Sequence, residues 1–317
     1  MTDTQSHETS SLKTSEKVIS VASSQTKNIS ELRKRVISGI ILIIIALSLT
    51  VYGGMSFTIF WYVVGILAFH EWVSMAGCQQ KILLTLFASI LMFFFVYLFW
   101  ISQPSGNIFI EDAINNIHTK PVFLPPLSIL TSMAAAGFMF VSLREVRGVR
   151  RWVVLGFFYS SVLVIVLPYI RGHNSDGLVG IAWLFGVVWG TDIGAFFTGR
   201  KFGGPKLWPR VSPKKTWSGF FGGLCIGSFT GAFVLFIASF NGFYLENVFF
   251  KYPGQILFYS AIGSVLCQLG DLAESAMKRH FQVKDSGTLI PGHGGILDRV
   301  DGLWATALFF GLLLLFK

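Results

Sequence analysis

The chain has 317 residues, of which 53% are hydrophobic and only 13% are charged, and its net charge is +9. Water-soluble domains usually contain about 25% charged residues, so this chain has too few to cover a soluble surface of its size. Soluble enzymes, coiled coils and mostly disordered chains are therefore excluded, and a polytopic membrane protein in a lipid bilayer remains. The basic excess indicates cytoplasmic loops before it indicates anionic ligands, and we expect no nucleic-acid partner.

Residues 1–30 form a polar tail rich in Ser and Thr, which we expect to be disordered. A cleaved signal segment ending near Ser48 is an alternative, but the polar stretch before it is unusually long, and an uncleaved first span is preferred. Nine later segments are apolar enough to cross a bilayer as helices, which predicts an all-α fold. These segments are 36–52, 55–76, 81–101, 121–142, 152–170, 177–199, 217–240, 254–278 and 300–316.

Basic residues alternate along the connections between these nine segments. With the N-terminus in the cytoplasm, 18 Lys and Arg residues fall on the cytoplasmic side and only four on the other side. Such a bias is the usual orientation signal of membrane proteins. We therefore predict a cytoplasmic N-terminus and nine transmembrane helices.

Five carboxylates lie in or beside the later apolar segments, at their predicted cytoplasmic ends. They are Asp192, Asp271, Glu274, Asp298 and Asp301. A carboxylate at membrane depth costs several kcal/mol unless it is paired or bound to metal, so a functional site is the first hypothesis and interhelical ion pairs are the alternative. Asp271 and Glu274 are three residues apart, as are Asp298 and Asp301, so each pair shares a helical face. Facing pairs would form a hard-oxygen site suited to Mg²⁺.

A glycine-rich turn, Pro291–Gly295, leads into the last predicted helix, where backbone N–H groups can approach a phosphate. The earlier basic loop, 200–215, can either bind phosphates or simply signal topology. Glycines, hydroxyls, basic groups and metal-type carboxylates on one membrane face together indicate phosphoryl or nucleotidyl transfer. The basic residues nearest the turn are Lys278, Arg279, Lys284 and Arg299.

The 27 residues from Ser275 to Asp301, SAMKRHFQVKDSGTLIPGHGGILDRVD, resemble the signature of the phosphatidate cytidylyltransferases (CDP-diacylglycerol synthases). Thr191–Arg200 and Ser212–Gly219 resemble a second region of that family. Two positions depart from the family pattern, with Phe196 where Tyr is frequent and Ser218 where Glu is frequent. These departures put details of substrate contact in doubt rather than the activity.

The resemblance implies a membrane enzyme that converts CTP and phosphatidate to CDP-diacylglycerol and pyrophosphate. It implies residues 31–317 as the cytidylyltransferase domain, with 177–317 as its catalytic half, in a bacterial inner membrane with the site facing the cytoplasm. It also implies a homodimer. Asp271 and Asp298 would hold Mg²⁺, with Asp192, Glu274 and Asp301 as further candidate ligands, and a second metal ion stays open.

The resemblance also implies roles for the surrounding residues. Asp271, Asp298, Lys284, Arg299 and His293 form the predicted catalytic set, in which His293 orients a phosphate rather than moving a proton. The predicted substrate-binding set consists of Ser212, Lys214, Lys215, Thr216, Ser275, Lys278, Arg279, Gly292, Gly294 and Gly295.

Two alternatives stay open at this point: a transporter of an anionic solute and another CTP-dependent lipid nucleotidyltransferase. A transporter would place its charges near the bilayer midplane in paired, broken helices, whereas here they gather at one face. A CDP-alcohol phosphotransferase is excluded because the sequence after Asp301 lacks that family's Arg and later carboxylates.

The polar tail yields the first testable prediction. Its composition cannot bury a core, and the resemblance begins well after it, so it should not support catalysis. Deleting residues 2–29 should leave the specific activity within about twofold, which is well under 1 kcal/mol of barrier. Activity per correctly inserted molecule is the measurement, and a large loss would show that the tail takes part.

Overall fold

The computed structural model describes residues 36–101, 148–172, 177–240, 253–290 and 294–315. Within these residues the chain forms eight helices and one two-stranded sheet. The helices are Val36–Tyr52, α2 (Gly54–Met75), α3 (Lys81–Ile101), α6 (Arg150–Gly172), α7 (Gly177–Phe202), α8 (Trp217–Phe240), α9 (Pro253–His280) and α10 (Leu297–Leu315).

The prediction of an all-helical, membrane-type fold is confirmed for the described residues. Five helices, α2, α6, α7, α8 and α9, are long and apolar enough to cross a membrane, and the first helix and α3 contain shorter apolar stretches. Eight of the nine predicted spans coincide with helices to within three residues at each end. The ninth, 121–142, lies outside the described residues, as do the 1–30 tail and its predicted disorder. The number of spans and the orientation stay predictions.

The basic segment between α7 and α8 contains a structure that the sequence analysis treats as a loop. Strands β1 (Lys206–Trp208) and β2 (Ser212–Thr216) pair antiparallel, with Lys206 opposite Thr216 and Trp208 opposite Ser212. Exposure falls along the end of β2, where Lys214 is exposed, Lys215 is partly exposed and Thr216 is buried.

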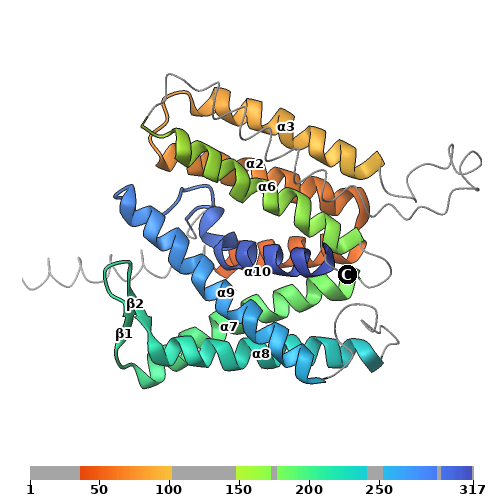
Figure 1. Cartoon of the computed structure of the whole chain (residues 1–317), viewed down its shortest axis with the longest axis vertical. Helices are drawn as coiled ribbons and strands as arrows, with labels where there is room; N and C mark the ends of the chain where they lie inside the picture. Colours follow the sequence, from red (N-terminus) through yellow and green to blue (C-terminus); the bar gives the residue numbers. More distant parts are fainter. Residues whose placement is uncertain (1–35, 102–147, 173–176, 241–252, 291–293, 316–317) are drawn as a thin grey trace, which may run out of the picture.

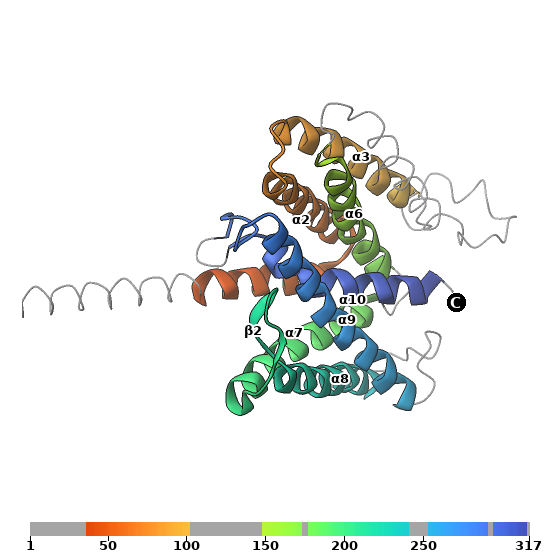
Figure 2. The ribbon, with the colours of Figure 1, turned by 60° about the vertical axis from the view of Figure 1, so that its left-hand side comes forward.

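The helices form three groups that are visible in both ribbon views (Figures 1 and 2). Helices α2, α3 and α6 form one group, α7 and α8 form another, and α9 and α10 lie between them. The largest fully buried side chain, Trp183 of α7, donates its indole N–H to Ser260 Oγ of α9 at 2.9 Å. The apolar core thus joins the central pair of helices, α9 and α10, to α7.

Small residues let α7 and α8 pack closely. The buried face of α8 carries glycine at every fourth position, a pattern that allows two helix backbones to approach. At this contact the Thr191 hydroxyl donates to Ser264 Oγ of α9 at 2.7 Å, and Ser264 donates to the Gly223 carbonyl at 3.2 Å. Asp192, the next residue of α7, lines a cavity together with Gln268 and Asp271 of α9. The four glycines of this buried face are Gly219, Gly223, Gly227 and Gly231.

Helices α9 and α10 pack closely at Gly270, where an added Cβ would clash with the carbonyl oxygen of Asp301. We expect Gly270→Ala to force the helices apart and to lower the stability by about 1–3 kcal/mol, as overpacking does. Thermal unfolding in detergent measures the change. Gly254→Ala, in the first turn of α9, is the matched control because a Cβ there meets nothing within 4 Å. Equal melting temperatures for the two variants would contradict the prediction.

Candidate active site

Three carboxylates from the central helix pair come together in what we call the acid cluster: Asp271 and Glu274 of α9 and Asp301 of α10. One oxygen of each lies within 4.8 Å of the others. Glu274 is buried, and Asp301 accepts the backbone N–H of Gly302 at 2.8 Å. Carboxylate oxygens are the ligands that hard divalent cations prefer. The acid cluster could therefore hold a metal ion.

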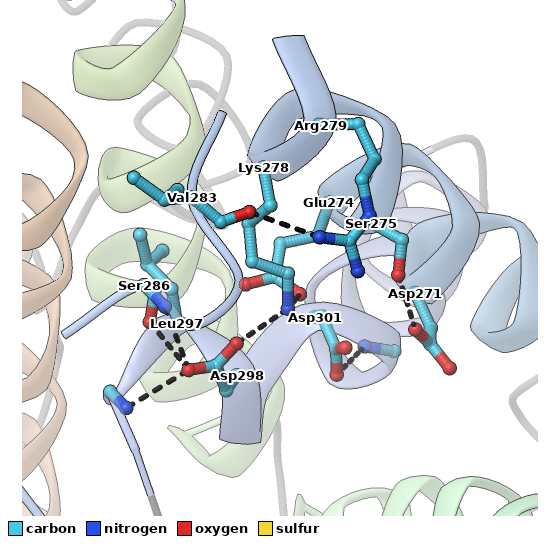
Figure 3. Close-up of polar contacts among 12 residues, drawn as sticks. Asp271, Glu274, Ser275, Lys278, Arg279, Val283, Ser286, Leu297, Asp298 and Asp301 are labelled. Atoms are coloured by element: carbon cyan, nitrogen blue, oxygen red, sulfur yellow. Dashed lines mark hydrogen bonds and ion pairs between the residues drawn. The ribbon is translucent and has the colours of Figure 1, made fainter. Parts of the chain in front are cut away.

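Asp298 lies one turn before Asp301 but takes part in a different set of contacts (Figure 3). Its Oδ1 pairs with Lys278 Nζ at 2.5 Å. Its Oδ2 accepts the N–H of Ser286 at 3.0 Å, the hydroxyl of Ser286 at 2.9 Å and the N–H of Gly295 at 2.9 Å. Through the three bonds to Oδ2, Asp298 holds the segment before α10 in place. The structure thus groups Asp271 with Glu274 and Asp301, whereas the sequence analysis paired it with Asp298.

Lys278 connects these two arrangements. Its ammonium group lies 2.9 Å from Glu274 Oε2 and 2.5 Å from Asp298 Oδ1, and Figure 3 shows it between the two carboxylates. The pair with Asp298 joins α9 to α10. It is the interhelical ion pair that the sequence analysis considered as the alternative to a functional carboxylate. Lys278 also compensates part of the charge of the acid cluster.

A cavity of about 510 Å³ opens beside the acid cluster, between α7, the hairpin, α8 and α9. Lys215 of β2 reaches Asp271 across it, with 2.5 Å between Nζ and Oδ2. Both side chains keep part of their surface exposed, 25% for Lys215 and 34% for Asp271, although the ammonium nitrogen of Lys215 is itself buried against Asp271. The polar lining consists of Asp192, Arg200, Lys214, Lys215, Thr216, Gln268 and Asp271.

Comparison with known proteins identifies the family. The model described as "Cytidylyltransferase family" matches residues 33–316. The chain belongs to the cytidylyltransferase family. A relative from Brucella suis biovar 1 (strain 1330), named phosphatidate cytidylyltransferase, is 37% identical over 279 residues, which cover 88% of this chain and 91% of the relative. A relative of the same name from Bacillus subtilis (strain 168) is 32% identical over 289 residues, which cover 90% of this chain and 99% of the relative. The resemblance found in the sequence is thereby confirmed.

The remaining residues of the cytidylyltransferase signature occupy varied places. Ser275 Oγ donates to Asp271 Oδ1 at 3.4 Å, so it borders the acid cluster. Arg279 donates to the backbone carbonyls of Val211 and Val283, at 3.4 and 3.2 Å, and thereby holds the hairpin against the end of α9. Lys284 and Arg299 are exposed, and Gly292 and His293 lie outside the described residues.

The structure also brings in a residue that the sequence analysis missed. Glu71 of α2 is 3% exposed, and its Oε2 accepts the Ser286 hydroxyl and the Leu297 N–H, each at 3.0 Å. An acidic residue inside the apolar segment 55–76 was a usable signal, because such residues seldom occur there without a partner. The position of that partner, more than 200 residues later, could not be read from the signal.

Proposed function

We propose that this cytidylyltransferase moves the CMP group of CTP onto phosphatidate, producing CDP-diacylglycerol and pyrophosphate for phospholipid biosynthesis. The names of the relatives support this reaction. The observation that carries it is the contact between Lys215 and Asp271, where the basic cavity meets the acid cluster. A nucleoside triphosphate and its metal ion need those two environments side by side.

The acid cluster fits a divalent cation such as Mg²⁺. Its donors are all carboxylate oxygens, and Glu274 Oε1 is buried without a hydrogen-bond partner among the described residues. Asp271, Glu274 and Asp301 would hold the ion. Mg²⁺ bound there would neutralise phosphate charge and polarise the phosphorus–oxygen bonds. The Mn²⁺ titration of Asp298→Asn in the Discussion tests Asp298 as a further ligand.

The residues around the cavity would position the reactants and balance their charge. An oxygen of the phosphatidate phosphate attacks the α-phosphorus of CTP, and the bond from that phosphorus to the bridging oxygen of the β-phosphate breaks. The attacking phosphate is already anionic near neutral pH, so a strong general base is unnecessary. Lys215 and Arg200 would bind the phosphates, the more exposed Lys214 would add only positive charge nearby, and the exposed Lys284 and Arg299 would approach from the signature segment.

We also propose that the site faces the cytoplasm of a bacterium from its inner membrane. The distribution of 18 basic residues against four supports this orientation. The acyl chains of phosphatidate can then stay in the bilayer while its headgroup reaches the cavity. The homodimer stays a prediction from the family resemblance.

A labelled-substrate assay with the purified, full-length protein tests the proposed function. In detergent with phosphatidate and Mg²⁺, radiolabel from CTP should enter the lipid fraction, and pyrophosphate should be released in equal amount. Chelation of the metal should stop both. Uptake of an anionic solute into vesicles without conversion would support the transporter instead, and absence of labelled lipid would refute the proposed reaction.

A further inference from the structure

A buried carboxylate of α2 reaches the segment that carries the cytidylyltransferase signature. Glu71 Oε2 accepts the backbone N–H of Leu297, the first residue of α10, at 3.0 Å. The first N–H groups of a helix have no partner inside that helix. Glu71 supplies one from another helix, and its negative charge is favourable at the N-terminal end of the α10 dipole. The start of α10 is thus held by a residue 226 positions earlier in the chain.

The hydroxyl of Ser286 lies between Glu71 and Asp298. Its oxygen is 3.0 Å from Glu71 Oε2 and 2.9 Å from Asp298 Oδ2. A hydroxyl has one hydrogen, so it donates to only one of these carboxylates at a time. Asp298 keeps the N–H groups of Ser286 and Gly295 when the hydroxyl turns toward Glu71. One side chain therefore links α2 to Asp298 and, through Asp298, to Lys278 beside the acid cluster.

The same segment also packs against the Glu71 carboxylate. A Cβ on Gly287 would lie 2.5 Å from Glu71 Oε1, and a Cβ on Gly295 would contact Glu71 Oε2. The backbone before the glycine-rich turn and at its last residue therefore packs against the Glu71 carboxylate. Glu71 does not belong to the cavity lining, which comes from α7, the hairpin, α8 and α9. Any influence it has on the reaction passes through the segment that it holds.

We propose that Glu71 is a positioning residue for cytidylyl transfer. By holding Ser286 and the N-terminus of α10, it fixes Asp298 and sets the place of Asp301 in the acid cluster. The purpose of this positioning rests on the proposed function, whereas the contacts themselves do not. Since Glu71 lies away from the cavity lining, its loss should lower kcat and leave the KM for CTP nearly unchanged.

Two substitutions of Glu71 in the full-length protein test the proposal. Glu71→Gln keeps an oxygen that can accept from Leu297 and Ser286, so kcat should stay within about threefold of the native value. Glu71→Ala removes both contacts, and kcat should fall about ten- to thirtyfold, with the KM for CTP within about twofold. Backbone hydrogen exchange over 284–297 should rise about tenfold or more in Glu71→Ala alone.

Ser286→Ala and Thr58→Val complete the experiment. If Glu71 acts through Ser286, the double variant Glu71→Ala with Ser286→Ala should lose less than the product of the two single losses. Thr58 is another buried polar residue of α2, but its hydroxyl donates to the Gly54 carbonyl of its own helix. Thr58→Val should therefore match the native protein in both readouts.

Several outcomes would overturn the proposal. They are a native kcat per folded molecule in Glu71→Ala, an equal loss in Glu71→Gln or Thr58→Val, or an effect confined to KM. If the native protein itself forms no labelled lipid, the proposed function fails on separate grounds. Hydrogen exchange then decides the role of Glu71, and unchanged exchange over 284–297 in Glu71→Ala refutes it.

Discussion

Replacement of Asp271 by Asn should lower cytidylyl transfer at least about a hundredfold, a loss of roughly 2.7 kcal/mol in transition-state stabilisation. Asp271 belongs both to the acid cluster and to the cavity lining, so the change removes charge where metal and triphosphate would meet. Folding and insertion should survive, since the amide has nearly the same shape and carries no buried charge. The measurement is kcat/KM for CTP at saturating Mg²⁺, together with Mn²⁺ affinity by calorimetry.

Asp301→Asn and Asp298→Asn distinguish two ligand sets for the metal ion: the acid cluster, and the pair of Asp271 and Asp298 predicted from the sequence. If the acid cluster holds the ion, Asp301→Asn should weaken Mn²⁺ binding about tenfold or more, the loss of one charged ligand. Asp298→Asn should then lower activity because it weakens the contacts with Ser286, Gly295 and Lys278, while the affinity for Mn²⁺ stays close to native. Loss of affinity in Asp298→Asn would restore the ligand set predicted from the sequence. Near-native activity of Asp271→Asn would remove the metal assignment altogether.

Most of the helical framework could be predicted from the sequence because a lipid environment leaves few choices. A long apolar segment must satisfy its backbone internally, so apolar length alone located eight helices. The ends were less certain because helices continue past the apolar part, as α7 does through Lys201 to Phe202. The hairpin was missed since Ser212–Thr216 shows no alternation of apolar and polar residues. Local backbone bonds form it, including Val211 N–H to the Trp208 carbonyl at 3.1 Å.

Helical spacing predicted part of the site and could not predict the rest. Asp271 and Glu274 are three residues apart within α9, and their carboxylates do lie together in the acid cluster. Asp298 and Asp301 have the same spacing, but Asp298 is in the first turn of α10, where the preceding segment offers it N–H donors. Spacing along a helix does not reveal contacts with a neighbouring segment. The N–H donors of that segment hold the Asp298 carboxylate away from the acid cluster. Glu71 was missed for the same reason, since its partners are set by tertiary packing.

Lys215→Ala should lower kcat/KM for CTP by about ten- to a hundredfold, corresponding to one lost charged hydrogen bond of roughly 1.5–3 kcal/mol. Lys215 is the hairpin residue that reaches Asp271 across the cavity, so the ammonium group lies where a triphosphate would meet the metal ligands. Lys214→Ala is the matched control, because it removes the same charge from the same strand at a more exposed position. Its kcat/KM should change by less than about threefold, the range of an exposed ion pair.

The comparison of these two lysines also separates phosphate binding from topology signalling. Arg200, Lys201, Lys206 and Arg210 stay in the same connection in both variants, so the connection should keep its side of the membrane. Accessibility of an introduced cysteine at the exposed Pro209 measures the topology on the same preparations. Equal kinetics of Lys215→Ala and the native protein would reduce the hairpin to a topology signal and assign the triphosphate to the exposed Lys284 and Arg299 of the signature segment. Equal losses in Lys214→Ala and Lys215→Ala would instead mean that the positive potential of the hairpin, rather than one ammonium group, attracts CTP.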